Sequence, residues 1–246
     1  KPGTVVLFEK IDSNDDGIGD SEIRVLGRLL AKGTQADPIF FQSAAADPHR
    51  KDWSYILFFT SGQVSVVEHC VIKHGFSGLQ AHFSTVNIAN VTFQDNHEGM
   101  RFGRAKLSIV NNRFVDNDVG IRFTRMEGPV SITFNEIRDN RIGVFLVPSG
   151  QNTQYFFEPD LSGKPWNTGR LLIKYNNISD NSWYNVSLGE KQFWDLDMPE
   201  NWWGTSDLTK IRQTLFDKRR DAALGSVILE PVAPHAIAEA GPQPEN

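Results

Sequence analysis

The chain has 246 residues, of which 39% are hydrophobic and 22% charged, and its formal net charge is −5. This length is sufficient for one sizeable core. The mild negative charge and the scattered basic residues argue against nucleic acid as the main partner. The single cysteine, Cys70, excludes an internal disulfide and an all-cysteine metal site. No apolar run is long enough to span a membrane as a helix.

The first distinctive motif is acidic and lies between two short apolar runs, at residues 5–8 and 23–26. Oxygen-bearing side chains recur there at alternate positions before a glycine, as in the Ca²⁺ loops of EF-hands and thrombospondin-type repeats. We expect residues 11–23 to form an inserted loop that holds a structural Ca²⁺, and a solvated acidic turn is the alternative. The expected ligands are Asp12, Asn14, Asp16, the carbonyl of Ile18, and Asp20.

A short phrase recurs along the middle of the chain, and the ends of successive copies are 21, 21, 23 and 41 residues apart. Three positions after each of the first four copies, a glycine opens a second alternating run. A repeat this short, with no helical period, cannot bury its apolar face alone and must stack on its neighbours. Each coil of the predicted solenoid therefore holds at least two strands. The copies are Cys70–Gly75, Val91–Asn96, Asn112–Asn117, Asn135–Asn140 and Asn176–Asn181.

Stacking at strand spacing, about 4.8 Å, places equivalent side chains in columns. The recurring asparagine is expected to take a left-handed backbone between strands, with Gly75 in its place in the first copy. Its side chains are expected to hydrogen-bond to one another along the solenoid. A parallel apolar column is expected from Ile72, Phe93, Phe114, Ile137 and Ile178.

The pattern resembles the right-handed parallel β-helix of pectate lyases, of sugar-hydrolase-type repeat proteins and of the periplasmic accessory proteins of nitrous-oxide-reductase maturation. Asp37–Ser43 followed by Asp52–Ile56 looks like the early coils of bacterial β-helix repeat proteins. Glu200–Gly204 and Leu224–Pro231 are similar to their closing segment. The resemblance implies an all-β solenoid with a short C-terminal helix, as one domain over residues 1–232. It also implies a secreted bacterial protein of the cell surface or periplasm.

The two ends of the solenoid are expected to differ. A helix within residues 206–218, capped near Asp207, presents Leu208 and Ile211 on one face and can cover the last coil. Residues 233–246 are rich in alanine, proline and glutamate and are expected to form a flexible tail. The first coil leaves backbone donors and acceptors open, so we expect upstream residues, a neighbouring domain or another protein to cover it.

Two polar columns are the candidates for catalysis. Asp95 and Asp116 begin a column that recurs in later coils, and Arg101 and Arg122 stand in register after the next turn. Carboxylates beside an arginine pair can hold and deprotonate a uronic acid, so these four residues are the catalytic candidates of a lyase or hydrolase. The alternative is that each aspartate caps its own turn and each arginine offsets its charge. Repetition in successive coils favours this alternative, because catalysis usually needs one special coil.

An insertion at residues 148–170 interrupts the repeat and carries several aromatic residues. Long loops on a rigid scaffold commonly carry function, and exposed rings suit sugar faces or a protein partner. Packing of this loop against the solenoid itself is the alternative. The candidate ligand-binding residues are Tyr155, Phe156, Phe157 and Trp166, with Trp183 in the next coil.

Three functions follow from these features. We expect first a non-catalytic scaffold that engages polysaccharide or another extracellular protein. The second hypothesis is a polysaccharide lyase or glycoside hydrolase acting on acidic polysaccharide. The third is a periplasmic metal-handling accessory protein that binds copper or zinc through His69, His74, His82 and His97.

Overall fold

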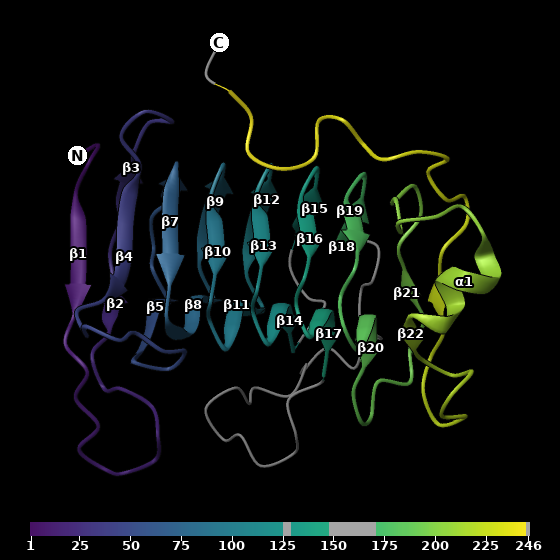
Figure 1. Ribbon diagram of the computed structural model, residues 1–246, viewed down its shortest axis with the longest axis horizontal. Coiled ribbons are helices and arrows are strands. Elements are labelled where there is room, and N and C mark those ends of the chain that lie inside the picture. The colour runs from purple at the N-terminus through teal and green to yellow at the C-terminus, as the bar shows by residue number, and fades with distance from the viewer. Residues whose placement is uncertain (125–128, 148–170, 245–246) are drawn as a thin grey trace.

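The computed structural model describes residues 1–124, 129–147 and 171–244. Across these residues the chain passes repeatedly through three sheets in the same order, and each return adds a parallel strand to each sheet. Figure 1 shows the resulting coils side by side along the long axis of the molecule. This arrangement is a parallel β-helix, as the repeat predicts.

The three sheets are named in the order in which the chain enters them. Sheet A contains β1 (Val5–Phe8), β4 (Ile39–Ser43), β7 (Cys70–Lys73), β10 (Thr92–Gln94), β13 (Arg113–Val115), β16 (Glu136–Arg138) and β19 (Asn177–Ser179). Sheet B contains β2 (Ile23–Val25), β5 (Trp53–Phe59), β8 (Gly75–His82), β11 (Glu98–Gly103), β14 (Val119–Phe123), β17 (Ile142–Leu146), β20 (Tyr184–Leu188) and β22 (Leu215–Phe216). Sheet C contains β3 (Leu30–Lys32), β6 (Ser65–Glu68), β9 (Thr85–Ala89), β12 (Lys106–Val110), β15 (Val130–Thr133) and β18 (Leu171–Lys174).

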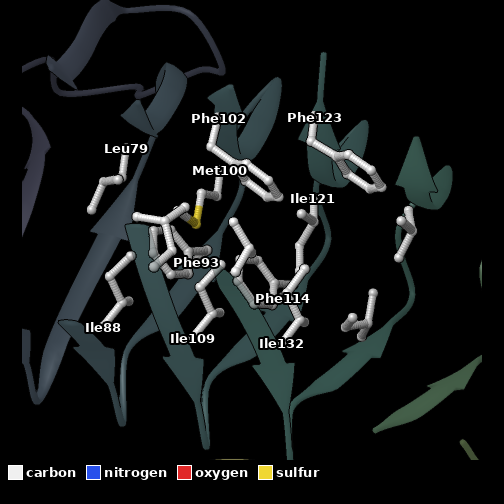
Figure 2. Close-up of a cluster of buried hydrophobic side chains, with 14 of the residues drawn as sticks. Leu79, Ile88, Phe93, Met100, Phe102, Ile109, Phe114, Ile121, Phe123 and Ile132 are labelled. Atoms are coloured by element: carbon white, nitrogen blue, oxygen red, sulfur yellow. The ribbon is translucent and has the colours of Figure 1, made fainter. Parts of the chain in front are cut away.

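The core consists of side chains stacked in register along the solenoid. The predicted apolar column is confirmed, because Ile72, Phe93 and Phe114 pair in register and are fully buried, and the column continues to Ile178. The rings of Phe93 and Phe114 stack with centroids 4.7 Å apart and planes 1° apart (Figure 2). Full burial of such a side chain contributes about 1.5–3 kcal/mol, so the repeated column is a main source of stability.

A glycine in sheet B changes which side chains face the core. A Cβ on Gly99 would point inward and lie 2.6 Å from the carbonyl oxygen of Gly120, so only glycine fits there. The next residue, Met100, also faces the core and is fully buried. The usual alternation of strand side chains is therefore interrupted, and Glu98 lies on the outer face beside Arg101.

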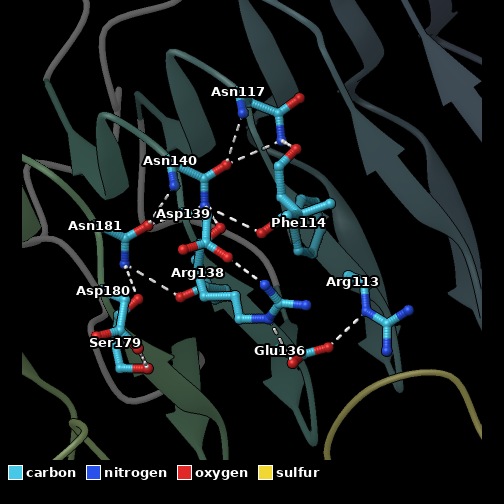
Figure 3. A network of polar contacts seen from close by, with 12 residues as sticks. Arg113, Phe114, Asn117, Glu136, Arg138, Asp139, Asn140, Ser179, Asp180 and Asn181 are labelled. Atoms are coloured by element: carbon cyan, nitrogen blue, oxygen red, sulfur yellow. Dashed lines mark hydrogen bonds and ion pairs between the residues drawn. The ribbon is translucent and has the colours of Figure 1, made fainter.

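The recurring asparagines form a hydrogen-bonded ladder, but the expected left-handed backbone lies one residue earlier. Asp116 and Asp139 have φ of 54° and 56°. Each following asparagine uses its amide to bridge coils, and Asn140 donates to Asn181 Oδ1 at 3.0 Å (Figure 3). Aspartate tolerates the left-handed region, which leaves the asparagine side chain free to enter the corner. A second ladder at the corner between sheets C and A consists of Asn112, Asn135, Asn176 and Asn201.

The C-terminal end is covered by a short helix and additional strands. Helix α1 (Leu208–Gln213) is capped by Asp207, whose Oδ1 accepts the N–H of Thr209 at 2.9 Å, and it buries Ile211. It is shorter than the expected 206–218 because β22 pairs with β20 in sheet B. Nearby, β21 (Leu196–Asp197) pairs with β23 (Val227–Ile228). No helix in the described ranges is long and apolar enough to cross a membrane.

The expectation of a flexible tail from residue 233 differs from the structure. Residues 233–244 run back across the coils, as the yellow trace in Figure 1 shows. Asn177 exchanges two hydrogen bonds with Ile237, and Asn90 Oδ1 accepts the N–H of Gln243 at 2.9 Å. The tail is held because the corner between sheets C and A presents polar groups at coil spacing, which composition alone does not reveal.

Cys70 and His82 are buried titratable side chains whose pKa values are strongly shifted by burial. Burial raises the pKa of the Cys70 thiol to about 12, so this thiol is protonated and unreactive at neutral pH. Burial lowers the pKa of His82 to about 4, although its ring contacts the carbonyl of Gly103 at 3.3 Å. His82 is therefore neutral in the folded protein at neutral pH.

We expect His82 to make the protein less stable as the pH falls from about 7.5 to about 5. The unfolded state takes up a proton near pH 6.5 and the folded state only near pH 4, so protonation in this range favours unfolding. The expected loss in the free energy of unfolding is about 2 kcal/mol. Urea unfolding at both pH values measures it, and His82→Gln should lack most of the loss. Equal losses in the two proteins would contradict the assignment.

Candidate binding face on sheet B

The outer face of sheet B carries a cluster of one glutamate and two arginines. Arg101 and Arg122 stand opposite each other on β11 and β14. Arg101 donates two hydrogen bonds to Glu98, at 2.7 and 2.6 Å, and Arg122 donates one at 2.7 Å. Glu98 is fully buried, whereas the arginine side chains are 22% and 28% exposed. We call these three residues the arginine–glutamate cluster.

The cluster keeps a buried carboxylate ionised. Burial alone would raise the pKa of Glu98, but the hydrogen bonds and charges of Arg101 and Arg122 hold it below its ordinary value. Each guanidinium is in turn committed to a carboxylate of the protein. The arginines therefore keep charge and the outer edges of their guanidinium groups at the surface, while their inner edges hold Glu98.

Aromatic rings extend the cluster in both directions along the face. The guanidinium of Arg101 lies over the ring of Phe76, 5.4 Å from its centroid. That of Arg122 lies 5.6 Å from the centroid of Phe145, which follows it in register on β17. The face therefore combines positive charge with aromatic ring surfaces.

A second group of charges adjoins the cluster through Phe76. The ring of Phe76 stacks on His97, and His97 Nδ1 lies 2.7 Å from Asp118 Oδ2. Arg50 Nη1 donates to Asp118 Oδ1 at 2.6 Å. Partial burial would raise the pKa of Asp118, but the hydrogen bond from His97 and the charges of Arg50 and Arg141 hold it below its ordinary value.

Trp183 marks the far end of this face. Its side chain is 59% exposed, and the guanidinium of Arg141 lies 4.2 Å from the centroid of its ring. The other predicted aromatic contacts, Tyr155, Phe156, Phe157 and Trp166, lie outside the described residues. Of the predicted ligand-binding set, Trp183 is thus the one that the structure describes.

The loop at residues 44–51 lies across several coils beside this face. Asp52 is 1% exposed and accepts hydrogen bonds from Ser43 Oγ at 2.8 Å and from the N–H of His49 at 2.9 Å. Arg50 reaches the third coil beyond its own, where it also donates to the carbonyl of Asp116 at 2.7 Å. The loop is therefore anchored at its base by a buried carboxylate and at its tip by Arg50.

The aspartate column is a feature of the turns. Asp95 and Asp116 lie in left-handed conformation immediately before ladder asparagines, at the corner between sheets A and B, as do the later members of the column. Arg101 and Arg122 lie on sheet B and pair with Glu98. The four catalytic candidates thus do not form one cluster of interacting side chains, and the backbone conformation accounts for the repeated aspartate.

The four histidines of the metal-handling hypothesis lie at three different corners of the coil. His69 lies beside Asn90, His82 is buried against Gly103, and His97 contacts Asp118. Within residues 1–124, 129–147 and 171–244, no group of three or more histidine, cysteine, aspartate and glutamate side chains is placed to hold a metal ion. The spacing of these histidines along the sequence did not reveal that they belong to different sheet corners.

The acidic loop near the start is closed by its own hydrogen bonds. Asp12 accepts the N–H of Gly17 at 2.9 Å, and Asp16 accepts that of Ile18 at 2.8 Å. Asp20 accepts the backbone and side-chain hydrogens of Ser13. In this arrangement the carboxylates stabilise the loop itself. Ca²⁺ binding by Asp12, Asn14, Asp16, Ile18 and Asp20 stays a prediction.

Sequence reasoning missed Glu98, Asp118 and Arg50. Glu98 occupies a register position held by Ser77 in the coil before and by Val119 in the coil after. A charged residue that interrupts a column of small or apolar residues is a signal of a local role. Arg50 carries no such signal, because its contact with Asp118 crosses 68 positions of sequence.

Comparison with known proteins agrees with this architecture. The family model described as a right-handed β-helix region matches residues 50–159. Searches of curated proteins and of solved structures gave no match. The matched segment includes β5 to β17, and the same parallel sheets continue on both sides of it. The match over residues 50–159 and the sheets that continue on both sides of it together show a right-handed parallel β-helix fold.

Proposed function

We propose that the protein is a non-catalytic binding module of a secreted or cell-surface protein, and that the outer face of sheet B binds acidic polysaccharide. The observation that carries the proposal is the local excess of positive charge. Among the described residues, Arg101 and Arg122 share Glu98, Arg50 pairs with Asp118, and the guanidinium of Arg141 lies over the ring of Trp183. The chain as a whole has a net charge of −5, so a positive face next to aromatic rings favours an acidic ligand.

The geometry supports binding more than cleavage. Lyase chemistry needs a base beside the sugar, and hydrolysis needs two carboxylates that face one groove. Glu98 is fully buried under two arginines, and Asp118 is shared by Arg50 and His97. These carboxylates serve to position the arginines, which suits a surface that is rigid before the ligand arrives.

Binding of polygalacturonate and alginate, with dextran as the neutral polymer, tests this proposal. Trp183→Ala and Arg141→Gln should each weaken binding of the acidic polymers about tenfold, which is about 1.4 kcal/mol. Both side chains are exposed, so the variants should fold normally. Matched controls are Trp194→Ala, another exposed tryptophan, and Arg113→Gln on sheet A, which should bind as the wild type does.

Unsaturated uronate absorbance and new reducing ends should be followed in the same samples. Binding without either product supports the proposal. Cleavage would overturn it in favour of a polysaccharide lyase or hydrolase. Absence of binding to every acidic polymer would also overturn it and would direct attention to a protein partner.

A further inference from the structure

A cleft of about 520 Å³ lies between the loop at 44–51 and the corner that joins sheets A and B. Its lining residues are Pro48, His49, Arg50, His74 and Asp95. The volume falls within the range typical of small-molecule sites, about 300–1,000 Å³. The cleft is separate from the arginine–glutamate cluster, and Arg50 joins it to Asp118 in the second group of charges beside that cluster.

The walls of the cleft are held in place before any ligand binds. The N–H of Asp52 donates to the carbonyl of His74 at 3.0 Å, and that of His74 donates to the carbonyl of Asp95 at 3.1 Å. Both His74 and Asp95 have left-handed backbone, with φ of 67° and 53°. Arg50 closes the opposite wall through its two hydrogen bonds to the third coil. A rigid cleft loses little conformational entropy when it binds a ligand.

One wall atom lacks a hydrogen-bond partner. His74 Nδ1 is buried and makes no hydrogen bond within the described part of the chain. A buried polar atom without a partner costs free energy, so rotation of the partly exposed His74 ring that brings this nitrogen to a hydroxyl group in the cleft would be favourable. Burial and the nearby charge of Lys73 lower the pKa of His74, so its imidazole is neutral at neutral pH. A neutral ring nitrogen pairs well with a hydroxyl group.

The charges of the cleft decide between classes of ligand. A metal ion is disfavoured, because the described residues offer no group of three suitable side chains. An anion is disfavoured in the cleft, because Asp118 offsets the one arginine of the lining, Arg50, and Asp95 adds a negative charge to that lining. A neutral polyhydroxylated ligand suits both polar walls, because each hydroxyl can donate to a carboxylate and accept from a neutral ring. The ring of Pro48 adds an apolar surface.

We propose that this cleft binds one neutral sugar unit, with hydroxyl groups on His74 and Asp95 and a face of the sugar ring against Pro48. The choice of a sugar among polyhydroxylated molecules rests on the polysaccharide binding proposed above. The neutral unit would be a side branch or a neutral residue of the polymer that sheet B binds.

Saturation-transfer NMR with methyl glycosides of glucose, galactose, mannose and N-acetylglucosamine tests the inference, with glycerol as the non-sugar polyol. At least one glycoside should bind with Kd of about 1 mM, and its addition should shift the His74 imidazole resonances. His74→Asn and Asp95→Asn should each weaken binding at least fivefold. Asparagine tolerates left-handed backbone, so both corners should be kept. His49→Ala changes the lining without altering a corner and should also weaken binding.

Asp180→Asn is the matched control, because Asp180 belongs to the same column and lies outside the cleft. It should bind the glycoside as the wild type does. If no glycoside binds, or if His74→Asn and Asp95→Asn leave binding unchanged, the inference is wrong. If the cleft inference fails in this way but acidic polysaccharide still binds the sheet B face, the proposed function stands. If instead a glycoside binds in the cleft and no acidic polymer binds, the cleft is a sugar site and the proposed function of sheet B is wrong.

Discussion

Replacing Asn140 with alanine is expected to lower the free energy of unfolding by about 3 kcal/mol or more. Asn140 is 1% exposed and lies in the middle of the first ladder. Its Oδ1 accepts the backbone N–H of Asn117 at 3.0 Å, and its Nδ2 donates to the carbonyl of Phe114 at 3.0 Å. Alanine leaves these buried groups unpaired, at about 1–3 kcal/mol each. Urea or thermal unfolding followed by circular dichroism measures the loss.

Asn177→Ala is the control for this prediction. Asn177 belongs to a neighbouring coil, and among the described residues its side chain bonds only to Ile237 in the C-terminal segment, at 3.0 and 2.8 Å. Its removal should cost about 1 kcal/mol. Similar losses from the two substitutions would show that the ladder position has no special contribution.

Glu98→Ala is expected to cost about 3 kcal/mol, because it removes the shared partner of two arginines beneath the face of sheet B. Arg101 and Arg122 would keep their charges without the carboxylate that they now flank. Glu136→Ala is a matched control, since Glu136 also bridges two arginines, Arg113 and Arg138, on sheet A (Figure 3). Glu136 is 21% exposed and its arginines about twice that, so solvent screens the pair and the cost should stay below about 1 kcal/mol.

Glu98→Ala and Glu136→Ala remove glutamates with similar partners that differ in how deeply the carboxylate is buried. Equal costs for Glu98→Ala and Glu136→Ala would show that the enclosed position of Glu98 is not what makes the cluster stable. Thermal unfolding at one pH near neutrality suffices, because both carboxylates are held ionised by their arginines, with pKa values below the ordinary range.

The fold was predictable because its period is visible in the sequence. The apolar column from Ile72 to Ile178 and the capping role of Asp207 follow from spacing and residue type, and the structure confirms both. The left-handed position was placed one residue late, on the asparagine. Aspartate and asparagine both tolerate left-handed backbone, so residue type alone does not decide between them. The structure decides it, because the asparagine side chain is buried in the corner between sheets A and B, where it bonds to the neighbouring coil.

The candidate site was less predictable, because it depends on residues that break the repeat. Arg101 and Arg122 were found from their register, but Glu98 was not, since its position outside the core depends on the glycine that follows it. The cleft beside His74 depends on the loop that Asp52 anchors. Contacts between coils that lie far apart in sequence leave no periodic signal, and the C-terminal segment was misjudged for the same reason.

Hydrogen–deuterium exchange with and without a saturating oligogalacturonide tests most directly whether sheet B is the binding face. Backbone amides are expected to gain protection in β8, β11, β14 and β17 and at Trp183, whereas sheet C, on another face of the solenoid, should exchange as before. Protection confined to sheet C or to the end of the solenoid at β1 would contradict the assignment of sheet B as the surface that binds acidic polysaccharide.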